Sequence, residues 1–427
     1  MNKLFKNLTF WVLVFGIFGY VLASFIGDPA WAKGAADSEI YNFILFLKTV
    51  FLSLLKMLIA PMIFLSLMGG LLNIGGKEKL KTMGKSVIIY YLSTTAIAIV
   101  IGLGCVFFIH PWESGSLKNM QGREQTSVMG GKYVKPKKYI SEGSDSIILI
   151  LKKLAERAFQ NPFEALTNNN ILGIATMSFL FGLAMVLTLK NGSSIPGMIE
   201  EANLLIHTIL GWVIKTTPIG VFAIAFDFQL KATGSILTEL LSFFLLVVGA
   251  TLFHGIVVLP TIAYFFGGVA PLTFFKKAAR PLLVALSTSS SSATLPVSMS
   301  TCEEEFGVSS GVSGFVFPLG ATMNMDGTAL FEGIAAIFLA NLYGVDLSGF
   351  SIFIIFFMSM ISSIGAPGMP SGSMAGMQMV LLGAGIPLEG IGILLVVERP
   401  LDAIRTAVNV EGDMIGALIA QKQLKEV

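Results

Sequence analysis

The chain has 427 residues, of which 54% are hydrophobic and 13% are charged, and its mean hydropathy is +0.79. This composition is typical of a polytopic membrane protein and argues against a soluble domain. The net charge of +2 gives no reason to expect a nucleic-acid partner. With two cysteines, Cys105 and Cys302, neither a disulfide framework nor a cysteine metal site is predicted. The histidines, His110, His207 and His254, lack metal-ligand spacing and are interpreted as packed or interfacial residues.

The N-terminal part of the chain contains three long hydrophobic runs. Residues 8–26 are long enough to span a bilayer and lack a good cleavage site, so we expect a retained first helix and not a signal peptide. In the second run, 44–74, Lys48 and Lys56 fit a tilted helix whose lysine side chains snorkel to an interface. Residues 75–85 form a short cationic loop, and the positive-inside rule predicts that this loop and the N-terminus lie in the cytoplasm. The third span is expected over 86–109.

The middle of the chain alternates polar and apolar stretches. Residues 111–144 are polar and rich in Gly and Lys, which indicates a flexible outer loop. The apolar stretch 147–188 is interrupted by charged residues and by the segment 161–170, so we expect a broken span. Two long helices are then expected, over 195–217 and 237–266.

Two later segments are apolar but interrupted. Residues 281–299 contain an unbroken run of hydroxyl residues, 287–292, and residues 351–386 contain a Gly- and Pro-rich stretch, 362–373. Lipid cannot satisfy irregular backbone, so such segments must be buried in protein or line a cavity. Both are therefore predicted to be re-entrant hairpins whose tips lie at the interruptions.

A third interruption lies in the span 312–343, which contains N-M-D-G-T at 324–328. It places Asp326 and Gly327 at membrane depth, where the helix is expected to unwind and free carbonyl groups for a cation. Paired interrupted segments are the sequence-level indication of a secondary transporter's binding site. Hydroxyls in the third span, at Tyr91 and Thr94 among others, are either helix–helix hydrogen bonds or ligands of a hard cation.

The stretch 398–413 reads E-R-P-L-D-A-I-R-T-A-V-N-V-E-G-D and lies between apolar runs. On a helix that advances roughly 100° per residue, one face carries Glu398, Asp402, Arg405, Thr406, Asn409 and Asp413, whereas Glu411 points the opposite way. A guanidinium suits a carboxylate, and a carboxylate suits an ammonium group or a metal cation, so the stripe indicates a zwitterionic or acidic solute handled together with cations. The alternative is a closed Asp402–Arg405 pair that only joins two helices.

At this point the sequence resembles bacterial members of the glutamate transporter family, the dicarboxylate/amino acid:cation symporters. The motifs that carry the resemblance cover nearly the whole chain: L-L-K-M-L-I-A-P-M-I-F at 54–64, N-P-F-E-A-L at 161–166, P-I-G-V-F-A at 218–223, the serine-rich tip, N-M-D-G-T-A-L at 324–330, and D-x-x-R-T-x-x-N-x-x-G-D from Asp402. The resemblance implies an all-α fold of eight transmembrane helices plus two re-entrant helical hairpins with inverted repeats. It also implies a homotrimer in the bacterial inner membrane, with both termini cytoplasmic.

The resemblance further implies elevator-type alternating access, in which a transport domain slides against a scaffold. The scaffold would comprise 1–85 and 145–234, and the transport domain would comprise the third helix, 86–110, and 235–427, with 111–144 as an extracellular loop. The Gly- and Pro-rich tip around 365–372 would be the gate, because loose backbone there can open and close over the solute.

The resemblance also implies site residues. The substrate site would use Arg405 for the side-chain carboxylate, Asp402 for the α-ammonium, and Asn409 with Ser291 and Ser292 for the α-carboxylate. Further substrate contacts would come from Thr328, Thr406, Met325 and Gly368. Three Na⁺ sites would consist of Asp413 with Gly320, Asn324 and Asn409; of Tyr91, Thr94, Thr95, Asn324 and Asp326; and of carbonyls from Thr322, Ser363, Ile364 and Ala366. All-oxygen ligation suits a hard cation such as Na⁺.

Residue types at four of these positions indicate the substrate and the coupling ion. Family members with arginine at position 405 resemble acidic amino acid carriers, and Asp402 argues for a substrate with an amino group. Asp413 favours Na⁺ over coupling to protons alone. Glu332 matches the position that proton-coupled relatives use as the proton carrier, while a hydrogen-bonded structural carboxyl is the alternative.

Several alternatives stay open at this stage. Within the family they are proton coupling, a neutral amino acid or cystine carrier, and a C4-dicarboxylate carrier; a passive channel is a further rival. An intramembrane enzyme is not supported, because the G-x-S-x-G match at 307–311 precedes a membrane span and not a strand-to-helix turn. Relatives commonly carry an additional arginine where this chain has Ser289 and Ala403, so neither potassium counter-transport nor a preference between glutamate and aspartate is predicted.

Overall fold

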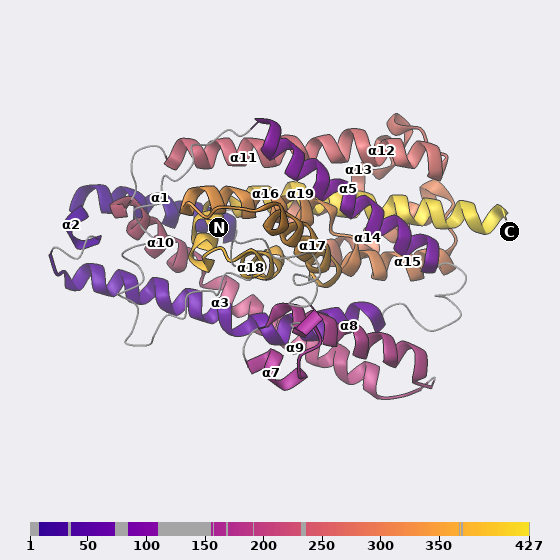
Figure 1. The fold of residues 1–427 in the computed structure, drawn as a ribbon. Helices are drawn as coiled ribbons and strands as arrows, with labels where there is room; N and C mark the ends of the chain where they lie inside the picture. Colours follow the sequence, from indigo (N-terminus) through magenta and orange to yellow (C-terminus); the bar gives the residue numbers. More distant parts are fainter. Residues whose placement is uncertain are drawn as a thin grey trace, which may run out of the picture.

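The computed structural model describes residues 8–32, 36–72, 84–109, 155–156, 158–167, 170–190, 192–231, 236–366, 368 and 370–426. Within these ranges every regular element is a helix (Figure 1), as the predicted all-α class requires. The predicted outer loop 111–144 lies outside the described residues, and so does nearly all of the predicted cationic loop 75–85.

The first helices form one side of the molecule. α1 packs along α10, and α3 packs against α8, α9 and α10. The expected first helix at 8–26 is present at those bounds. The helices of this group are α1 (Leu8–Ile26), α2 (Pro29–Ala32), α3 (Glu39–Leu72), α7 (Pro162–Thr167), α8 (Ile171–Thr188), α9 (Ile195–Lys215) and α10 (Thr217–Lys231). α7 and α8 confirm the break expected near 161–170, and the Asn170 side chain caps α8 by accepting a hydrogen bond from Gly173 N at 3.4 Å.

A polar contact joins two of these helices. Lys48 Nζ on α3 lies 2.7 Å from Asp227 Oδ2 on α10, and the Tyr41 hydroxyl donates to Asp227 Oδ1 at 2.5 Å. Asp227 is buried, and its charge is therefore compensated by this cation and this donor. The ion pair holds the Lys48 ammonium group against α10, and its predicted location at a membrane interface stays a prediction.

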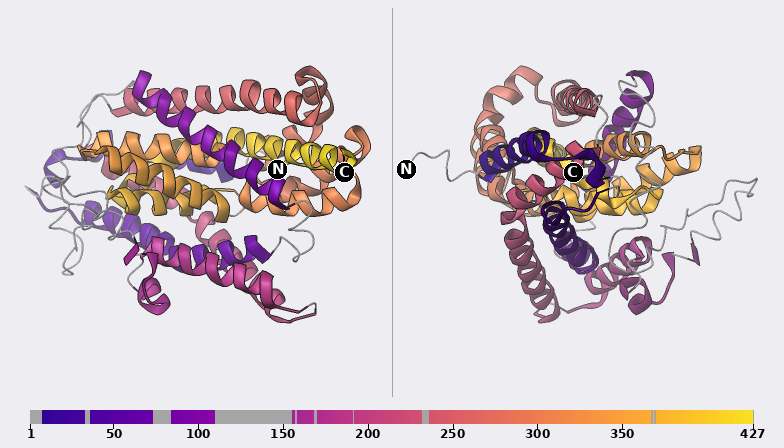
Figure 2. Two further views of the ribbon diagram at one scale, coloured as in Figure 1. Left: turned by 45° about the vertical axis from the view of Figure 1, so that its right-hand side comes forward. Right: turned by 90° about the vertical axis from the view of Figure 1, so that its left-hand side faces the viewer.

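The remaining helices form a second body around the end of the chain. α19 (Ile391–Glu426) runs through the middle of this body, and α5 (Lys85–Ile109) packs across both α19 and α16 (Figures 1 and 2). The expected helix at 237–266 consists of α11 (Ile236–Phe253), a π-helical turn η4 (His254–Val258), α12 (Leu259–Ile262) and a second π-helical turn η5 (Ala263–Gly267). Thr238–Gly267 is continuous enough to count as one span.

Each of the two predicted hairpins consists of two helices joined by a short connection. The first consists of α13 (Pro271–Thr288) and α14 (Ser291–Phe306), and the second of α17 (Gly349–Gly365) and α18 (Ser373–Ala384). In the first tip, Ser289 ends α13 with a left-handed φ of 49°, and the Ser290 side chain accepts a hydrogen bond from Ala293 N to begin α14. The serine run thus supplies both the turn and the cap.

The interruption in the span 312–343 is also present, at a slightly different place. α15 (Ser310–Met323) ends before Asn324, and α16 (Asp326–Tyr343) begins at Asp326. The prediction that Asp326 and Gly327 are themselves unwound is wrong by two residues. Asp326 instead occupies the first turn of α16, where the helix dipole favours a negative charge.

Three helices of the described residues are long and apolar enough to cross a bilayer: Lys85–Ile109, Thr238–Gly267 and Ser310–Tyr343. The bent pair Ile195–Lys215 and Thr217–Asp227 makes a fourth if its 50° bend is taken as one span. These helices confirm the polytopic membrane class, while the total of eight spans stays a prediction. Ser310–Tyr343 is the most enclosed, with 94% of its apolar window buried.

Candidate substrate and cation site

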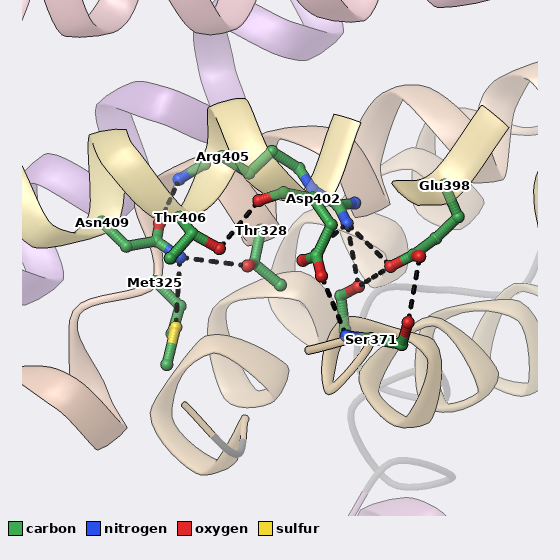
Figure 3. A network of polar contacts seen from close by, with 10 residues as sticks. Met325, Thr328, Ser371, Glu398, Asp402, Arg405, Thr406 and Asn409 are labelled. Carbon is green, nitrogen blue, oxygen red and sulfur yellow. Dashed lines mark hydrogen bonds and ion pairs between the residues drawn. The ribbon is translucent and has the colours of Figure 1, made fainter. Parts of the chain in front are cut away.

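The polar site lies where three interruptions of regular structure meet one face of a continuous helix. The two hairpin tips, the α15–α16 break and the polar face of α19 surround it (Figure 3). The six predicted residues of the α19 stripe are all buried, and Glu411, on the opposite face, is buried too. A stripe of this polarity can be enclosed only if its groups find partners.

Arg405 is the centre of the network, with 1% of its surface exposed. Its Nη2 lies 3.1 Å from Glu398 Oε1 and 3.2 Å from Asp402 Oδ1, and it donates to Ser373 Oγ at 3.1 Å. The ring of Phe331 stacks under the guanidinium, 3.9 Å from Cζ. Nε and Nη1 have no hydrogen-bond partner among the described residues. The Asp402–Arg405 pair therefore exists, but it uses only one nitrogen of the guanidinium.

The second hairpin tip is tied to the two acids of this network. Ser371 N donates to Asp402 Oδ2 at 2.9 Å, and its hydroxyl donates to Glu398 Oε2 at 3.0 Å (Figure 3). Ser371 has a φ of 59°, the left-handed region that L residues seldom adopt. The two hydrogen bonds help to hold this conformation. Sequence reasoning did not select Ser371, Ser373 or Phe331; the Gly- and Pro-rich surroundings were the only signal for the two serines.

Asn409 joins α19 to the break between α15 and α16. Its Oδ1 accepts a hydrogen bond from Gly327 N at 2.8 Å, and its Nδ2 lies 3.3 Å from Thr328 Oγ1 and 3.2 Å from Met325 Sδ. A Cβ at Gly327 would lie 2.8 Å from Arg405 O, so only glycine permits this approach. Thr406 donates to its own helix, to Asp402 O at 2.7 Å.

The tips of the two hairpins touch each other. The Ser290 hydroxyl donates to Gly368 O at 2.6 Å, and Ser292 N donates to the same oxygen at 3.0 Å. Of the two predicted serines, Ser291 is buried and the Ser292 side chain is exposed. The predicted gate residue Gly368 thus closes directly against the first tip.

The enclosed space is small. A cavity of about 10 Å³ remains between the tips and α19, which is room for about one water molecule. It is lined by Ser289, Ser291, Met325, Thr328, Ala366, Gly368, Ser373, Asp402, Thr406 and Asn409. Seven of the nine predicted substrate residues therefore line one small cavity, whereas Arg405 and Ser292 are not among its lining residues. A space of this size cannot hold an amino acid, so binding requires neighbouring groups to move.

A first group of candidate cation ligands surrounds Asp413. Asn324 Nδ2 donates to Asp413 Oδ1 at 3.0 Å and to Asn409 O at 3.2 Å. Gly320 faces them, because a Cβ there would lie 2.4 Å from Asp413 Oδ1 and 2.6 Å from the Tyr91 hydroxyl oxygen. Asn324 Oδ1 is buried without a hydrogen-bond partner among the described residues, as an unused oxygen ligand would be.

A second group surrounds Asp326, which is fully buried. Thr95 donates to Asp326 Oδ1 at 2.6 Å, and Thr94 lies 3.4 Å from the same oxygen. His254 Nε2 lies 3.1 Å from Asp326 Oδ2. His254 is buried as expected, but it contacts a candidate ligand and does more than fill space. Tyr91, which is predicted for this second group, donates its hydroxyl to Val316 O at 3.1 Å. The same hydroxyl lies beside Gly320 of the first group, because a Cβ on Gly320 would be 2.6 Å from it.

The third predicted group consists of backbone carbonyls where α15 and the second hairpin meet. α15 contacts α17, Ser363 and Ala366 are buried, and Gly368 closely approaches Ala321 O. Thr322 and Ser363 hydroxyls donate within their own helices, to Leu319 O at 3.1 Å and to Met360 O at 3.0 Å. No hydrogen bond joins Thr322 to Ile364 in the described part of the chain, so this group stays a prediction.

Glu332 lies apart from the stripe, on α16. Its Oε1 accepts a hydrogen bond from Ser362 Oγ at 2.7 Å, whereas Oε2 has no partner among the described residues. A Cβ at Gly376 would lie 2.3 Å from Oε1, so the second hairpin packs directly on this carboxyl. Glu332 is thus coupled to both arms of that hairpin.

The charges of the two inner helices do not balance. α16 and α19 bury one guanidinium, Arg405, against six carboxyl groups, those of Asp326, Glu332, Glu398, Asp402, Glu411 and Asp413. Unpaired ionised acids are costly in a low-dielectric interior. Within the described residues no group of three or more His, Cys, Asp or Glu side chains could hold a metal ion. The donors are mixed carboxylate, amide, hydroxyl and carbonyl oxygens, which suit hard cations.

A buried charged site between two helical hairpins and a broken helix, in an apolar chain whose described elements are all helices, is typical of a membrane transporter. The sequence pattern of the sodium:dicarboxylate symporter family matches residues 8–423, and the chain belongs to that family.

Individual relatives match over most of their length. A putative sodium-dependent excitatory amino acid transporter of Caenorhabditis elegans, glt-4, is 31% identical over 96% of this chain and 89% of its own. The proton/sodium-glutamate symport protein of Geobacillus stearothermophilus is 32% identical over 87% of this chain and 86% of its own. The neutral amino acid transporter B(0) of Bos taurus is 30% identical over 92% of this chain and 76% of its own.

Proposed function

We propose that this protein is a symporter that takes up an acidic amino acid, aspartate or glutamate, together with Na⁺. The observation that carries the substrate class is the buried guanidinium of Arg405, whose Nε and Nη1 have no partner among the described residues. Unsatisfied N–H donors are costly when they are buried, and a substrate carboxylate would satisfy them. A neutral side chain would leave them unpaired, which disfavours the neutral amino acid and cystine alternatives.

Asp402 is the proposed partner of the substrate ammonium group. It lines the cavity and accepts a hydrogen bond from Ser371 N, so its carboxylate is fixed in direction. A C4-dicarboxylate would place a second carboxylate beside this acid, and like charges at such a distance repel. One guanidinium, that of Arg405, and one carboxylate, that of Asp402, lie side by side at 3.2 Å, and together they support an amino acid with an acidic side chain.

The excess of buried acids supports cation coupling. An incoming acidic amino acid carries a net negative charge into a site that already holds more acids than bases. Cations at the Asp413 and Asp326 groups would compensate this charge, and their binding would therefore favour substrate binding at the same time. Na⁺ is the proposed cation because the donors are neutral oxygens and single carboxylates, with Asp413 as the carboxylate of the first group.

Glu332 is the proposed carrier of a co-transported proton. Its hydrogen-bond partner among the described residues is the Ser362 hydroxyl and not a cation, whereas an ionised carboxylate at membrane depth would need a cation. Its contact with Ser362 links the state of the carboxyl to the second hairpin. Such a link is what proton loading together with substrate requires.

The packing supports a moving inner body and a fixed outer one. α5, α11 and the segments from α13 to α19 pack on one another, whereas α1, α3 and α8 to α10 pack mainly among themselves. We propose that the inner body is the transport domain (86–110 and 235–427) and the outer helices are the scaffold (1–85 and 145–234). The second hairpin tip would be the gate, a homotrimer the assembly and the bacterial inner membrane the location, with both termini cytoplasmic.

Radiolabelled uptake by the purified protein in liposomes tests the proposal. We expect saturable aspartate or glutamate uptake that requires an inward Na⁺ gradient, with competition by unlabelled acidic amino acids and none by alanine or succinate. If a proton gradient without Na⁺ drove uptake as fast as the Na⁺ gradient does, Na⁺ coupling would be overturned. Uptake of a neutral amino acid in preference to both acidic ones would overturn the role of Arg405.

A further inference from the structure

His254 is the one fully buried histidine whose side chain the described residues include, and it contacts a candidate cation ligand from outside the site. Its Nε2 lies 3.1 Å from Asp326 Oδ2, while the other oxygen, Oδ1, faces Thr95 and Thr94. A carboxylate can only accept, so Nε2 carries the hydrogen of this bond. Nδ1 has no hydrogen-bond partner among the described residues, so the contact with Asp326 is the one side-chain hydrogen bond of this ring there.

The backbone holds this histidine in place. His254 begins the π-helical turn η4, and its carbonyl accepts a hydrogen bond from Leu259 N, five residues on. Pro260, which follows, cannot donate a backbone hydrogen bond, so the regular pattern is interrupted here. Insertions of this kind are rare and occur frequently at functional sites.

Close packing fixes the turn against α19. A Cβ on Gly255 would lie 2.8 Å from Val408 Cγ2 and 3.2 Å from Glu411 Oε2. The missing side chain therefore lets η4 approach α19, the helix that also carries Asp413. His254 is held from both sides, by its own turn and by this contact.

From this geometry we infer that His254 is a positioning residue for a Na⁺ site at Asp326. By holding Oδ2, it fixes the plane of the carboxylate so that Oδ1 faces the hydroxyls of α5. To bind a cation beside Asp326, Oδ1 and the hydroxyl oxygens of Thr94 and Thr95 must stop hydrogen-bonding to one another and turn their lone pairs to the ion. Thr94 already has other acceptors, because its hydroxyl lies 3.2 Å from Tyr90 O and 3.1 Å from Tyr91 O. A hydrogen-bonded outer group commonly orients a ligating group in this way.

This inference rests on the proposed Na⁺ coupling, and the experiment separates the two. The Na⁺ concentration for half-maximal aspartate uptake, and the maximal rate at saturating Na⁺, are measured for His254→Leu, His254→Gln and Asp326→Asn. We expect His254→Leu to raise the half-maximal concentration about tenfold, the loss typical of one hydrogen bond to a charged group, with little change in the maximal rate. Glutamine retains an N–H at a similar reach, so His254→Gln should restore wild-type Na⁺ dependence within about threefold.

Two further variants complete the design. Thr251→Val, one turn earlier on the same helix, removes a buried hydroxyl that has no partner among the described residues, and it should leave Na⁺ dependence unchanged. The asparagine side chain in His254→Asn is too short to reach Asp326, so its Na⁺ dependence should resemble that of His254→Leu. If the leucine variant does not fold, the Na⁺ dependence of His254→Asn is compared with that of His254→Gln instead. In the Asp326→Asn background, His254→Leu should add no further shift.

The outcomes are distinct. If Asp326→Asn shifts Na⁺ dependence and His254→Leu does not, the positioning role is overturned while Na⁺ coupling stands. An equal fall in maximal rate for the leucine and glutamine variants, with unchanged half-maximal Na⁺, would mean that His254 only packs. If Asp326→Asn itself has no effect on Na⁺ dependence, the proposed Na⁺ site at Asp326 is wrong and the inference fails with it.

Discussion

Asn324 Nδ2 lies 3.0 Å from Asp413 Oδ1, so the break between α15 and α16 is joined directly to the polar face of α19. The two residues are 89 positions apart in the chain, and the same amide also donates to Asn409 O. Through these bonds one side chain connects a candidate cation ligand with a residue that lines the substrate cavity. A cation at Asp413 would therefore change the position of groups that contact the substrate.

Gly320 provides a steric test of the Asp413 cation site. A methyl group there would lie 2.4 Å from Asp413 Oδ1 and 2.6 Å from the Tyr91 hydroxyl, so Gly320→Ala must displace a proposed ligand. We expect the half-maximal Na⁺ concentration for aspartate uptake to rise by about tenfold or more, as for the loss of one strong ligand contact. Gly314→Ala, on the same helix with nothing within 4 Å of the added atom, is the matched control. Equal behaviour of the two variants would place the cation elsewhere.

Removing the charge of Asp413 tests the same site electrostatically. Asp413→Asn keeps the size of the side chain and its contact with Asn324, but it supplies no negative charge to a cation. We expect weaker Na⁺ dependence and a lower aspartate affinity at fixed Na⁺, both measured from uptake against Na⁺ concentration. An unaltered Na⁺ response would show that Asp413 is not a ligand.

Arg405 tests the substrate class. Arg405→Cys removes the only guanidinium that α16 and α19 bury, so aspartate affinity should fall about a hundredfold or more, and neutral amino acids should become substrates. The variant also leaves Glu398 and Asp402 without their cation, so thermal stability must be measured beside uptake. Arg280→Cys, at an exposed position of α13, is the control. Unchanged aspartate affinity in a folded Arg405→Cys protein would remove the substrate assignment.

Glu332 tests proton coupling. Glu332→Gln keeps a hydrogen-bond acceptor for Ser362 but cannot gain or lose a proton. If the carboxyl carries a proton, aspartate uptake by this variant should become insensitive to external pH, while Na⁺ dependence persists. Proton movement with substrate, followed by a pH-sensitive dye inside the liposomes, should disappear. Its persistence at the wild-type ratio would rule out Glu332 as the carrier.

The sequence predicts local features of this fold better than it predicts contacts across it. The helix at 8–26, both hairpins and the buried face from Glu398 to Asp413 follow from hydrophobic length, interruptions and helical period. The predicted α15–α16 break is misplaced by two residues. The start of α16 depends on the place of Asp326 at the helix N-terminus and on the hydrogen bond from Gly327 N to Asn409 Oδ1, and the second of these is a contact with a distant segment.

Contacts between distant segments had no signal in the sequence. Ser371 and Glu398 are 27 residues apart, and His254 and Asp326 are 72 apart. A lone histidine in an apolar helix predicts burial but no partner. Lys48 was expected to reach an interface, and its acidic partner lies 179 residues away on α10. Such pairs depend on how the helices pack, which periodicity along one segment does not encode.

The most direct test of the account is a simultaneous measurement of radiolabelled Na⁺ and radiolabelled aspartate entering the same liposomes. We predict that each aspartate is accompanied by a fixed number of Na⁺ ions greater than one, and that the number falls in Asp413→Asn. Aspartate entry without stoichiometric Na⁺ entry would contradict the assignment of the buried oxygen groups around Asp413 and Asp326 as coupling sites.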